Sequence, residues 1–152
     1  MPRPRAGDWL RDEISAWRYE GLAVIVSLLE SHEERELDLK DEAAFCYAEG
    51  IEYLSFPVPD RGVPASFSGT RRLVDFLVEK LIGGLGVGIH CRAGIGRSSL
   101  IAACVLVKLG VTPSECFTTI ARSRGLPVPD TSEQQRWLSL FSRDYIAPKL
   151  VK

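Results

Sequence analysis

The chain has 152 residues, 45% of them hydrophobic and 26% charged, and a formal net charge of −1. This composition argues against disorder of the whole chain, and the near-neutral charge provides no global basic field for binding nucleic acid. The length suits one hydrophobic core, so we expect a single domain over 1–152, with residues 1–7 as a frayed tail.

The first half of the chain alternates helices with strands. A helix is expected over 8–21, because apolar side chains recur on one face before a stop at Gly21. The apolar, β-branched run LAVIVSLL predicts a buried strand over 22–29. A second helix over 37–50 and a second strand over 51–58 follow.

The second half repeats this order after a turn, PDRGVP, at 59–64. A helical apolar stripe covers 66–84, and the short stretch GVGIH predicts a third strand over 86–90. Further helices are expected over 96–110, 111–125 and 129–146. The last two begin with capping-box patterns, one at Thr112, Pro113 and Glu115 and the other at Asp130 and Glu133.

Strands that alternate with helices predict an α/β fold. We expect a single domain with a central, mainly parallel β-sheet that is flanked by helices on both faces. Ligands in such folds bind beyond the carboxyl ends of the strands. The stretch HCRAGIGRSS, residues 90–99, lies at such a point, between the third strand and the following helix.

The composition of this stretch predicts an anion site. Backbone N–H groups in a glycine-rich turn can point inward together, and a helix N-terminus adds further donors and positive potential. Gly94 and Gly96 give the backbone freedom that a tight loop needs, and Arg97 adds a planar fork that matches phosphate oxygens. The loop is therefore predicted to bind a tetrahedral oxyanion.

Cys91 stands at the entrance to this loop. The groups that bind an anion also stabilise a thiolate, so we expect Cys91 to be an ionised nucleophile that faces phosphorus. A Walker loop needs a lysine that the stretch lacks, and a zinc site is poorly supplied by His32 and His90 without a CxxC pair. We expect neither a metal nor another cofactor.

The remaining cysteines and the apolar runs indicate the cellular compartment of the protein. Cys46, Cys104 and Cys116 lie among apolar residues and are expected to be buried, reduced thiols, with a redox partnership to Cys91 as the alternative. No apolar signal region follows Met1, and no apolar run is long enough to span a bilayer. We therefore expect a soluble, cytoplasmic protein without membrane contacts. The sequence leaves the oligomeric state open, with a monomer favoured.

HCRAGIGRSS resembles the H-C-x-x-G-x-x-R-[ST] signature of the cysteine-dependent protein tyrosine phosphatases. Its place after several helices and strands resembles the dual-specificity branch, and within it the kinase-associated phosphatase type. The resemblance covers most of the chain, residues 20–145, and implies that Cys91 forms a phosphocysteine, Arg97 holds two phosphate oxygens and Ser98 hydrogen-bonds the sulfur. It also implies a phosphate-binding loop made by His90, Arg92, Ala93, Gly94, Ile95 and Gly96.

The family also places an aspartic acid on an upstream loop, where it protonates the leaving group. FPVPDRGVP offers Asp60 for this role, with an ordinary turn residue as the alternative. DTSEQ resembles the Q-T-x-x-Q element that positions the hydrolytic water: Gln134 matches the second glutamine, whereas Asp130 replaces the first. Gln134 is a candidate at the pocket mouth or an exposed helix residue, and Asp130 is expected to be an N-cap. Candidate substrate-side charges are Arg61, Arg92 and Arg124; for Arg61 and Arg124 the alternative is an ordinary surface arginine, whereas the loop carries Arg92 to the pocket rim.

The resemblance implies a phosphomonoester hydrolase that acts on phosphotyrosine, and on phosphoserine or phosphothreonine, in a phosphorylated protein partner. One alternative is a phosphoinositide or RNA 5′-phosphatase on the same loop, although inositide-acting relatives carry lysines where this chain has Arg92, Ala93 and Ile95. Another is a phosphoprotein-binding pseudophosphatase. Such proteins lose the cysteine, the arginine or the acid, and all three are present here.

Overall fold

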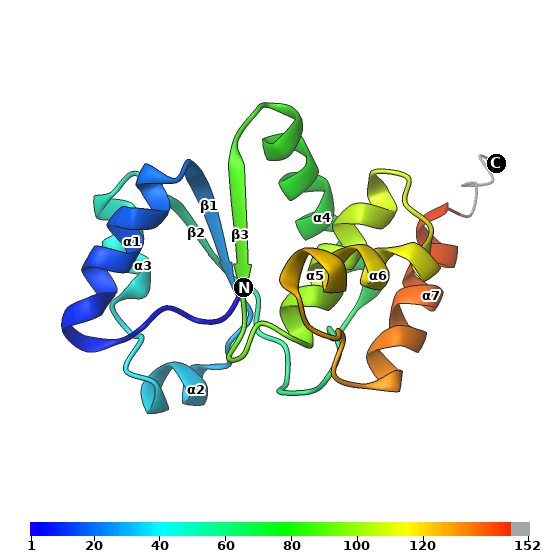
Figure 1. The fold of residues 1–152 in the computed structure, drawn as a ribbon, viewed down its shortest axis with the longest axis horizontal. Coiled ribbons are helices and arrows are strands. Elements are labelled where there is room, and N and C mark those ends of the chain that lie inside the picture. Colours follow the sequence, from blue (N-terminus) through cyan, green and yellow to red (C-terminus); the bar gives the residue numbers. More distant parts are fainter. Residues whose placement is uncertain (147–152) are drawn as a thin grey trace.

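A three-stranded parallel sheet lies at the centre of the computed structural model, which describes residues 1–146 (Figure 1). In spatial order, its strands are β2 (Glu52–Ser55), β1 (Leu22–Ser27) and β3 (Gly86–His90). Ile25 of the central strand pairs with Tyr53 on one side and Gly88 on the other. The parallel sheet of an α/β fold is therefore confirmed.

The central strand β1 is buried on both faces, which explains its continuous apolar sequence. Side chains alternate between the two faces of a strand. Val24 and Val26 pack into one core together with Leu28, whereas Ile25 and Leu29 pack into the other. All five are at most 1% exposed, so one short segment contributes to both cores.

Helices cover both faces of the sheet, as expected (Figure 1). One face carries η1 (Gly7–Trp9), α1 (Leu10–Tyr19) and α3 (Glu42–Ala48). The other carries α4 (Phe67–Ile82) and α5 (Arg97–Lys108), and against α5 pack α6 (Pro113–Arg124) and α7 (Ser132–Ile146). Among residues 1–146, no helix combines the length and the apolar character that crossing a bilayer requires.

One helix was not predicted from the sequence: α2 (Ser31–Glu36), which directly follows β1. Its sequence, SHEERE, has no apolar stripe that could reveal it. A reciprocal cap closes its N-terminus, because the Glu30 side chain accepts the Glu33 N–H and the Glu33 carboxylate accepts the Glu30 N–H at 2.9 Å. The cap fixes Glu33 next to the carboxyl end of the sheet.

The helix predicted over 37–50 begins later, at Glu42. Residues 37–41 are turn and irregular backbone, and Asp38 has a φ of 54°, a left-handed conformation that interrupts a helix. The prediction was wrong in this part because DLKDE is a helix-compatible composition.

The predicted capping boxes also differ from the structure. Thr112 is the N-cap of α6, but its hydroxyl donates to the Glu115 carboxylate at 2.6 Å and caps no backbone N–H. At α7 the box lies one residue later: Thr131 Oγ1 accepts the Gln134 N–H at 3.2 Å, and Gln134 Oε1 accepts the Thr131 N–H at 3.3 Å. The expectation that Asp130 is an N-cap is therefore wrong.

The expectation that residues 1–7 form a frayed tail is also wrong. Pro2 forms a parallel bridge with Cys91, immediately beyond β3. The segment passes so close to the next loop that a Cβ atom on Gly94 would lie 2.4 Å from the Met1 backbone carbon. Gly94 has a φ of 73°, so this position requires glycine for its conformation as well as for this contact.

Candidate active site

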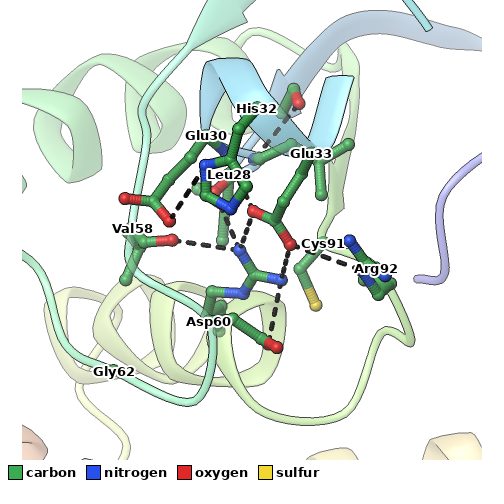
Figure 2. Close-up of polar contacts among 12 residues, drawn as sticks. Leu28, Glu30, His32, Glu33, Val58, Asp60, Gly62, Cys91 and Arg92 are labelled. Carbon is green, nitrogen blue, oxygen red and sulfur yellow. Dashed lines mark hydrogen bonds and ion pairs between the residues drawn. The ribbon is translucent and has the colours of Figure 1, made fainter. Parts of the chain in front are cut away.

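Three segments meet at the carboxyl end of the sheet, because parallel strands end at one edge. Helix α2 brings Glu33, the loop after β2 brings Asp60, and the loop after β3 brings Cys91 (Figure 2). Beside them lies a pocket of about 240 Å³. Its lining residues are Asp60, Arg61, Cys91, Arg92, Ala93, Gly96, Arg97 and Asp130.

A larger hollow of about 580 Å³ lies between α6 and α7 and contains none of the predicted site residues. Its walls carry no ionisable side chain, so they offer neither a strong nucleophile nor a group for proton transfer. The chemistry-bearing side chains therefore gather at the smaller pocket.

The loop from His90 to Arg97 holds the predicted nucleophile. Cys91 is 3% exposed, its Sγ accepts the N–H of Gly94 at 3.3 Å, and the Oγ of Ser98 lies 3.3 Å from the sulfur. Helix α5 begins at Arg97, so the positive end of its dipole faces the loop. The Gly94 N–H and the N-terminus of α5 therefore both face the sulfur at the edge of the pocket.

The other predicted loop residues divide into two groups. Arg92 and Ala93 are exposed at the pocket rim, and Gly96 is buried in the pocket wall. Gly94 and Ile95 are buried and half-buried respectively and do not line the pocket. Any contact of these two with a bound anion would therefore come from the backbone.

Arg97 is buried and held by a buried carboxylate. Its Nη1 and Nη2 donate to the two oxygens of Glu33 at 2.7 and 2.8 Å, which is a two-pronged ion pair. Nη1 also donates to the Val58 carbonyl at 3.0 Å. The guanidinium is thus fixed along one side, and its Nε makes no hydrogen bond within the described part of the chain.

The ion pair between Glu33 and Arg97 shifts the pKa of both groups. Burial alone would raise the pKa of Glu33, but the hydrogen bonds from Arg97 and from the Glu30 backbone, with the charges of Arg97 and Arg92, hold that pKa below its usual range. Burial alone would lower the pKa of Arg97, whereas the hydrogen bonds and charge of Glu33 raise it. Both groups are therefore ionised at neutral pH.

Asp60, the predicted acid, lies on the loop after β2. Its Oδ1 is 3.2 Å from Arg97 Nη2, and its side chain is 59% exposed. The loop turns sharply, because the Gly62 N–H donates to the Pro59 carbonyl at 2.8 Å and Arg61 takes a φ of 58°. The sequence-predicted acid and arginine are thus brought together at the pocket mouth.

His90 lies below the loop and outside the pocket. Its Nε2 is 2.6 Å from the Glu42 carboxylate, and both side chains are fully buried. The other polar atom of each, Nδ1 of His90 and Oε2 of Glu42, has no partner among the described residues. His90 therefore supports the end of β3 through α3 and is not positioned to contact a ligand.

Gln134 is fully buried and does not line the pocket. Its Nε2 donates to the Gly62 carbonyl at 3.1 Å, and its Oε1 accepts the Asp130 N–H at 3.1 Å. One side chain thus connects the loop of Asp60 with the start of α7. Asp130, expected to cap the helix, lines the pocket instead.

The arginines expected on the substrate side have different surroundings. Arg92 forms ion pairs with Glu33 at 3.4 Å and Glu36 at 3.1 Å, which partly neutralise the rim. Arg124 donates to the Gly94 carbonyl and therefore supports the loop from α6. Of the three arginines that line the pocket, Arg61 alone forms no ion pair with a residue in the range 1–146.

Sequence reasoning missed two buried glutamates, Glu33 and Glu42. For Glu33 a signal was available: the residue closely follows the carboxyl end of the central strand, and a buried arginine requires a carboxylate partner. For Glu42 no signal exists, because a glutamate in a charged stretch is normally solvated.

The other three cysteines are buried, as expected. Burial, followed by the charge of Glu42, raises the pKa of Cys46 to about 12. Burial and the charge of Glu115 raise the pKa of Cys116 to about 11, and burial raises that of Cys104 well above its usual value. These thiols are unreactive at neutral pH.

The parallel sheet and the cysteine–arginine loop at its edge define the class of the cysteine-dependent protein tyrosine phosphatases. Residues 1–111 match the family described as "Polymorphic toxin system, DSP-PTPase phosphatase". The match covers most of the chain, and the chain belongs to this family. The resemblance to the dual-specificity branch is thereby confirmed.

Individual proteins agree with this assignment. Cyclin-dependent kinase inhibitor 3 of Rattus norvegicus is 32% identical over 103 residues, which are 66% of this chain and 48% of that protein. The chain thus matches about half the length of this curated relative.

Two solved structures share the fold. A kinase associated phosphatase with its catalytic cysteine replaced by serine has a TM-score of 0.84 at 22% identity, covering 98% of this chain and 86% of that one. Tk-PTP in its active form has a TM-score of 0.76 at 25% identity, covering 94% and 88% respectively. The first supports the expected likeness to the kinase-associated type at the level of fold.

Proposed function

We propose that this protein hydrolyses phosphotyrosine, and phosphoserine or phosphothreonine, in protein substrates through a phosphocysteine intermediate. One observation carries the proposal: the sulfur of Cys91 lies in the pocket at the start of α5, where it accepts the Gly94 N–H at 3.3 Å. A thiolate held by backbone donors at a helix N-terminus is a nucleophile next to an anion site.

In the first step, the thiolate of Cys91 attacks phosphorus, so that a sulfur–phosphorus bond forms and the bond to the leaving oxygen breaks. Arg97 has two donors for the phosphoryl oxygens: its Nε, and the Nη2 hydrogen that now points to Asp60 at 3.2 Å. Because Glu33 holds the other edge of the guanidinium, this fork is preorganised for the charge of the transition state.

The leaving oxygen needs a proton, which we assign to Asp60. Phosphate that binds to Arg97 takes over the donor now used by Asp60. The displaced carboxyl group then lies at the mouth of the pocket, where the leaving group departs. Its exposure allows it to exchange protons with the solvent between turnovers.

The second step returns the cysteine. Water attacks the phosphocysteine, and the electron pair of the sulfur–phosphorus bond returns to Cys91. Ser98 Oγ, 3.3 Å from the sulfur, donates a hydrogen bond that stabilises the departing thiolate. His90 and Glu42 support the loop from below in both steps.

The charges around the pocket favour a protein substrate over a phosphoinositide. Polyphosphorylated headgroups need several free cations, and Arg92 is already paired with Glu33 and Glu36. Arg61 remains as a contact for an acidic group beside the phosphorylated residue. The DSP-PTPase family and the cyclin-dependent kinase inhibitor 3 relative also support a phosphoprotein partner.

The test is turnover of an aryl phosphate, a phosphotyrosine peptide, a phosphothreonine peptide and a phosphoinositide by the purified protein. We expect activity on the first three, and Cys91→Ser should abolish it while phosphate still binds. Cys116→Ala, at another buried cysteine, is the control and should keep full turnover per folded molecule. Phosphopeptide binding without turnover in the wild type would instead identify a binding module.

A further inference from the structure

Asp130 is a second carboxylate in the pocket that contains Cys91, Arg97 and Asp60. It lies against the phosphate-binding loop, because a Cβ atom built on Gly96 would be 2.5 Å from its Oδ2. A side chain at position 96 would displace this carboxylate, and its Cβ atom would also lie 2.9 Å from Gln134 Nε2. Asp130 therefore borders the place where phosphorus is bound during the reaction.

The carboxylate of Asp130 has no cation. Asp60 has Arg97 at 3.2 Å, whereas the side chain of Asp130 makes no hydrogen bond or ion pair within the described part of the chain. An unpaired carboxylate beside an anion loop repels the phosphate dianion and therefore weakens binding. Asp130 is exposed, so its carboxylate is in contact with solvent as well as with the pocket, as a group that accepts a proton from water must be.

The backbone of Asp130 is nevertheless fixed. Its N–H donates to Gln134 Oε1 at 3.1 Å, and Gln134 is fully buried. The Nε2 of the same side chain donates to the Gly62 carbonyl at 3.1 Å. The backbone of Asp130 is thus held at a constant position relative to the loop of Asp60, which keeps its carboxylate at the same side of the pocket.

We propose that Asp130 is the general base of the second step. Its carboxylate accepts a hydrogen bond from the attacking water and then receives the proton. The water oxygen forms a bond to phosphorus, the sulfur–phosphorus bond breaks, and its electron pair returns to Cys91. Inorganic phosphate and the thiolate are the products, and the proton leaves Asp130 to solvent. This inference rests on the proposed phosphatase function.

The two carboxylates then serve different steps. Asp60 gives its proton to the leaving group in the first step and lies beside Arg97. Asp130 comes from the segment before α7 and receives a proton in the second step. Loss of Asp130 should therefore slow hydrolysis of the phosphocysteine and leave its formation unchanged.

The experiment is rapid-quench kinetics with an aryl phosphate, with the phosphoenzyme measured directly. In Asp130→Asn, the burst of aryl alcohol should keep the wild-type rate, whereas hydrolysis of the phosphoenzyme should fall by about a hundredfold. Phosphoenzyme should accumulate, and inorganic phosphate should inhibit about threefold more strongly because one repulsive charge is gone. Asp130→Glu, which keeps a carboxylate, should recover part of the rate.

Asp12→Asn, an exposed position on α1, is the matched control and should behave as wild type. Phosphoenzyme hydrolysis within twofold of wild type in Asp130→Asn would overturn the proposal, as would a defect confined to the burst. Failure of the proposed function looks different, because the wild type itself would then form no phosphoenzyme.

Discussion

The tetrapeptide PVPD occurs twice in the chain, ending in Asp60 and in Asp130, and both aspartates line one pocket. Their surroundings differ. Asp60 lies 3.2 Å from Arg97, whereas Asp130 has no cationic partner among residues 1–146 and is positioned through its backbone by Gln134. Two aspartates in identical local sequence thus have different surroundings, because the groups around them come from distant parts of the chain.

The supporting elements explain how both reach the same place. Asp60 follows β2, so the parallel sheet delivers it to the carboxyl edge. Asp130 precedes α7, and the capping box of Thr131 and Gln134 sets where that helix begins. A strand end positions one aspartate and a helix cap positions the other.

Among the variants that test the difference between Asp60 and Asp130, Asp60→Asn should have the largest effect. This change removes the proton for the leaving group, so turnover of phosphotyrosine or phosphoserine peptides should fall by about a hundredfold. An activated aryl phosphate, whose leaving group departs without a proton, should lose much less. We would measure kcat/KM for both substrates across pH, corrected for ionisation of the substrate.

The pH dependence of kcat/KM provides a second test with the same variant. In the wild type, kcat/KM should rise as the thiolate forms and fall as the acid is deprotonated, and Asp60→Asn should lose only the alkaline fall. Equal losses on both substrates, or an unchanged alkaline limb, would mean that Asp60 is a turn residue. Asp130 would then be the first alternative acid.

A smaller effect is expected when the support of Arg97 is weakened. Glu33→Gln leaves one hydrogen bond where the structure has a two-pronged ion pair, so kcat should fall about tenfold, or about 1.4 kcal/mol. The free energy of unfolding should fall by about 2 kcal/mol, because hydrogen bonds between charged groups are lost. Glu36→Gln, on the same helix but exposed, is the control and should change both quantities little.

Acid should reproduce this loss in the wild type. Because the pKa of Glu33 is lower in the folded protein than in the unfolded chain, its contribution to stability is complete above the unfolded value of about 4.3. It is lost as the pH falls through the folded pKa. Glu33→Gln lacks this contribution throughout, so urea unfolding should show a shallower decline in stability below pH 4.3. Parallel curves for the two proteins would contradict the assignment.

Much of this architecture could be predicted from the sequence. The third strand, the loop and α5 were predicted together, because GVGIH and the glycine-rich turn each carry a local signal. Cys91, Arg97 and Asp60 were predicted from motif and resemblance, and the structure brings them to one pocket. Sequence patterns within one short segment were sufficient to predict the part of the site that this segment forms by itself.

The remainder depends on tertiary contacts. Helix α2 has no apolar stripe, so neither it nor Glu33 could be found by periodicity. The helix cap at Thr131 instead of Asp130 is a one-residue difference between two acceptable N-caps, which only packing decides. Residues 1–3 lie against the phosphate loop, although nothing in the composition of the segment 1–7 indicates order.

Substitution of Gln134 should have the smallest effect of these variants, and it should affect both Asp60 and Asp130. Its Nε2 bonds the Gly62 carbonyl beyond Asp60, and its Oε1 bonds the Asp130 N–H. Gln134→Leu keeps the volume but removes these two hydrogen bonds and a third, which Oε1 accepts from the Thr131 N–H at 3.3 Å. Each contributes about 1 kcal/mol. The backbone groups of both loops then lose a fixed partner, so neither carboxylate is held at a constant position.

Rapid-quench kinetics should therefore show a change of about fivefold in both steps of Gln134→Leu, because a loss of about 1 kcal/mol corresponds to that factor. Asp60→Asn and Asp130→Asn should each change one step only. The neighbouring Gln135→Leu is the matched control: Gln135 is exposed on the same helix and should leave both rates unchanged. If Gln134→Leu slowed a single step, the side chain would serve one loop alone, and the two PVPD segments would be positioned independently.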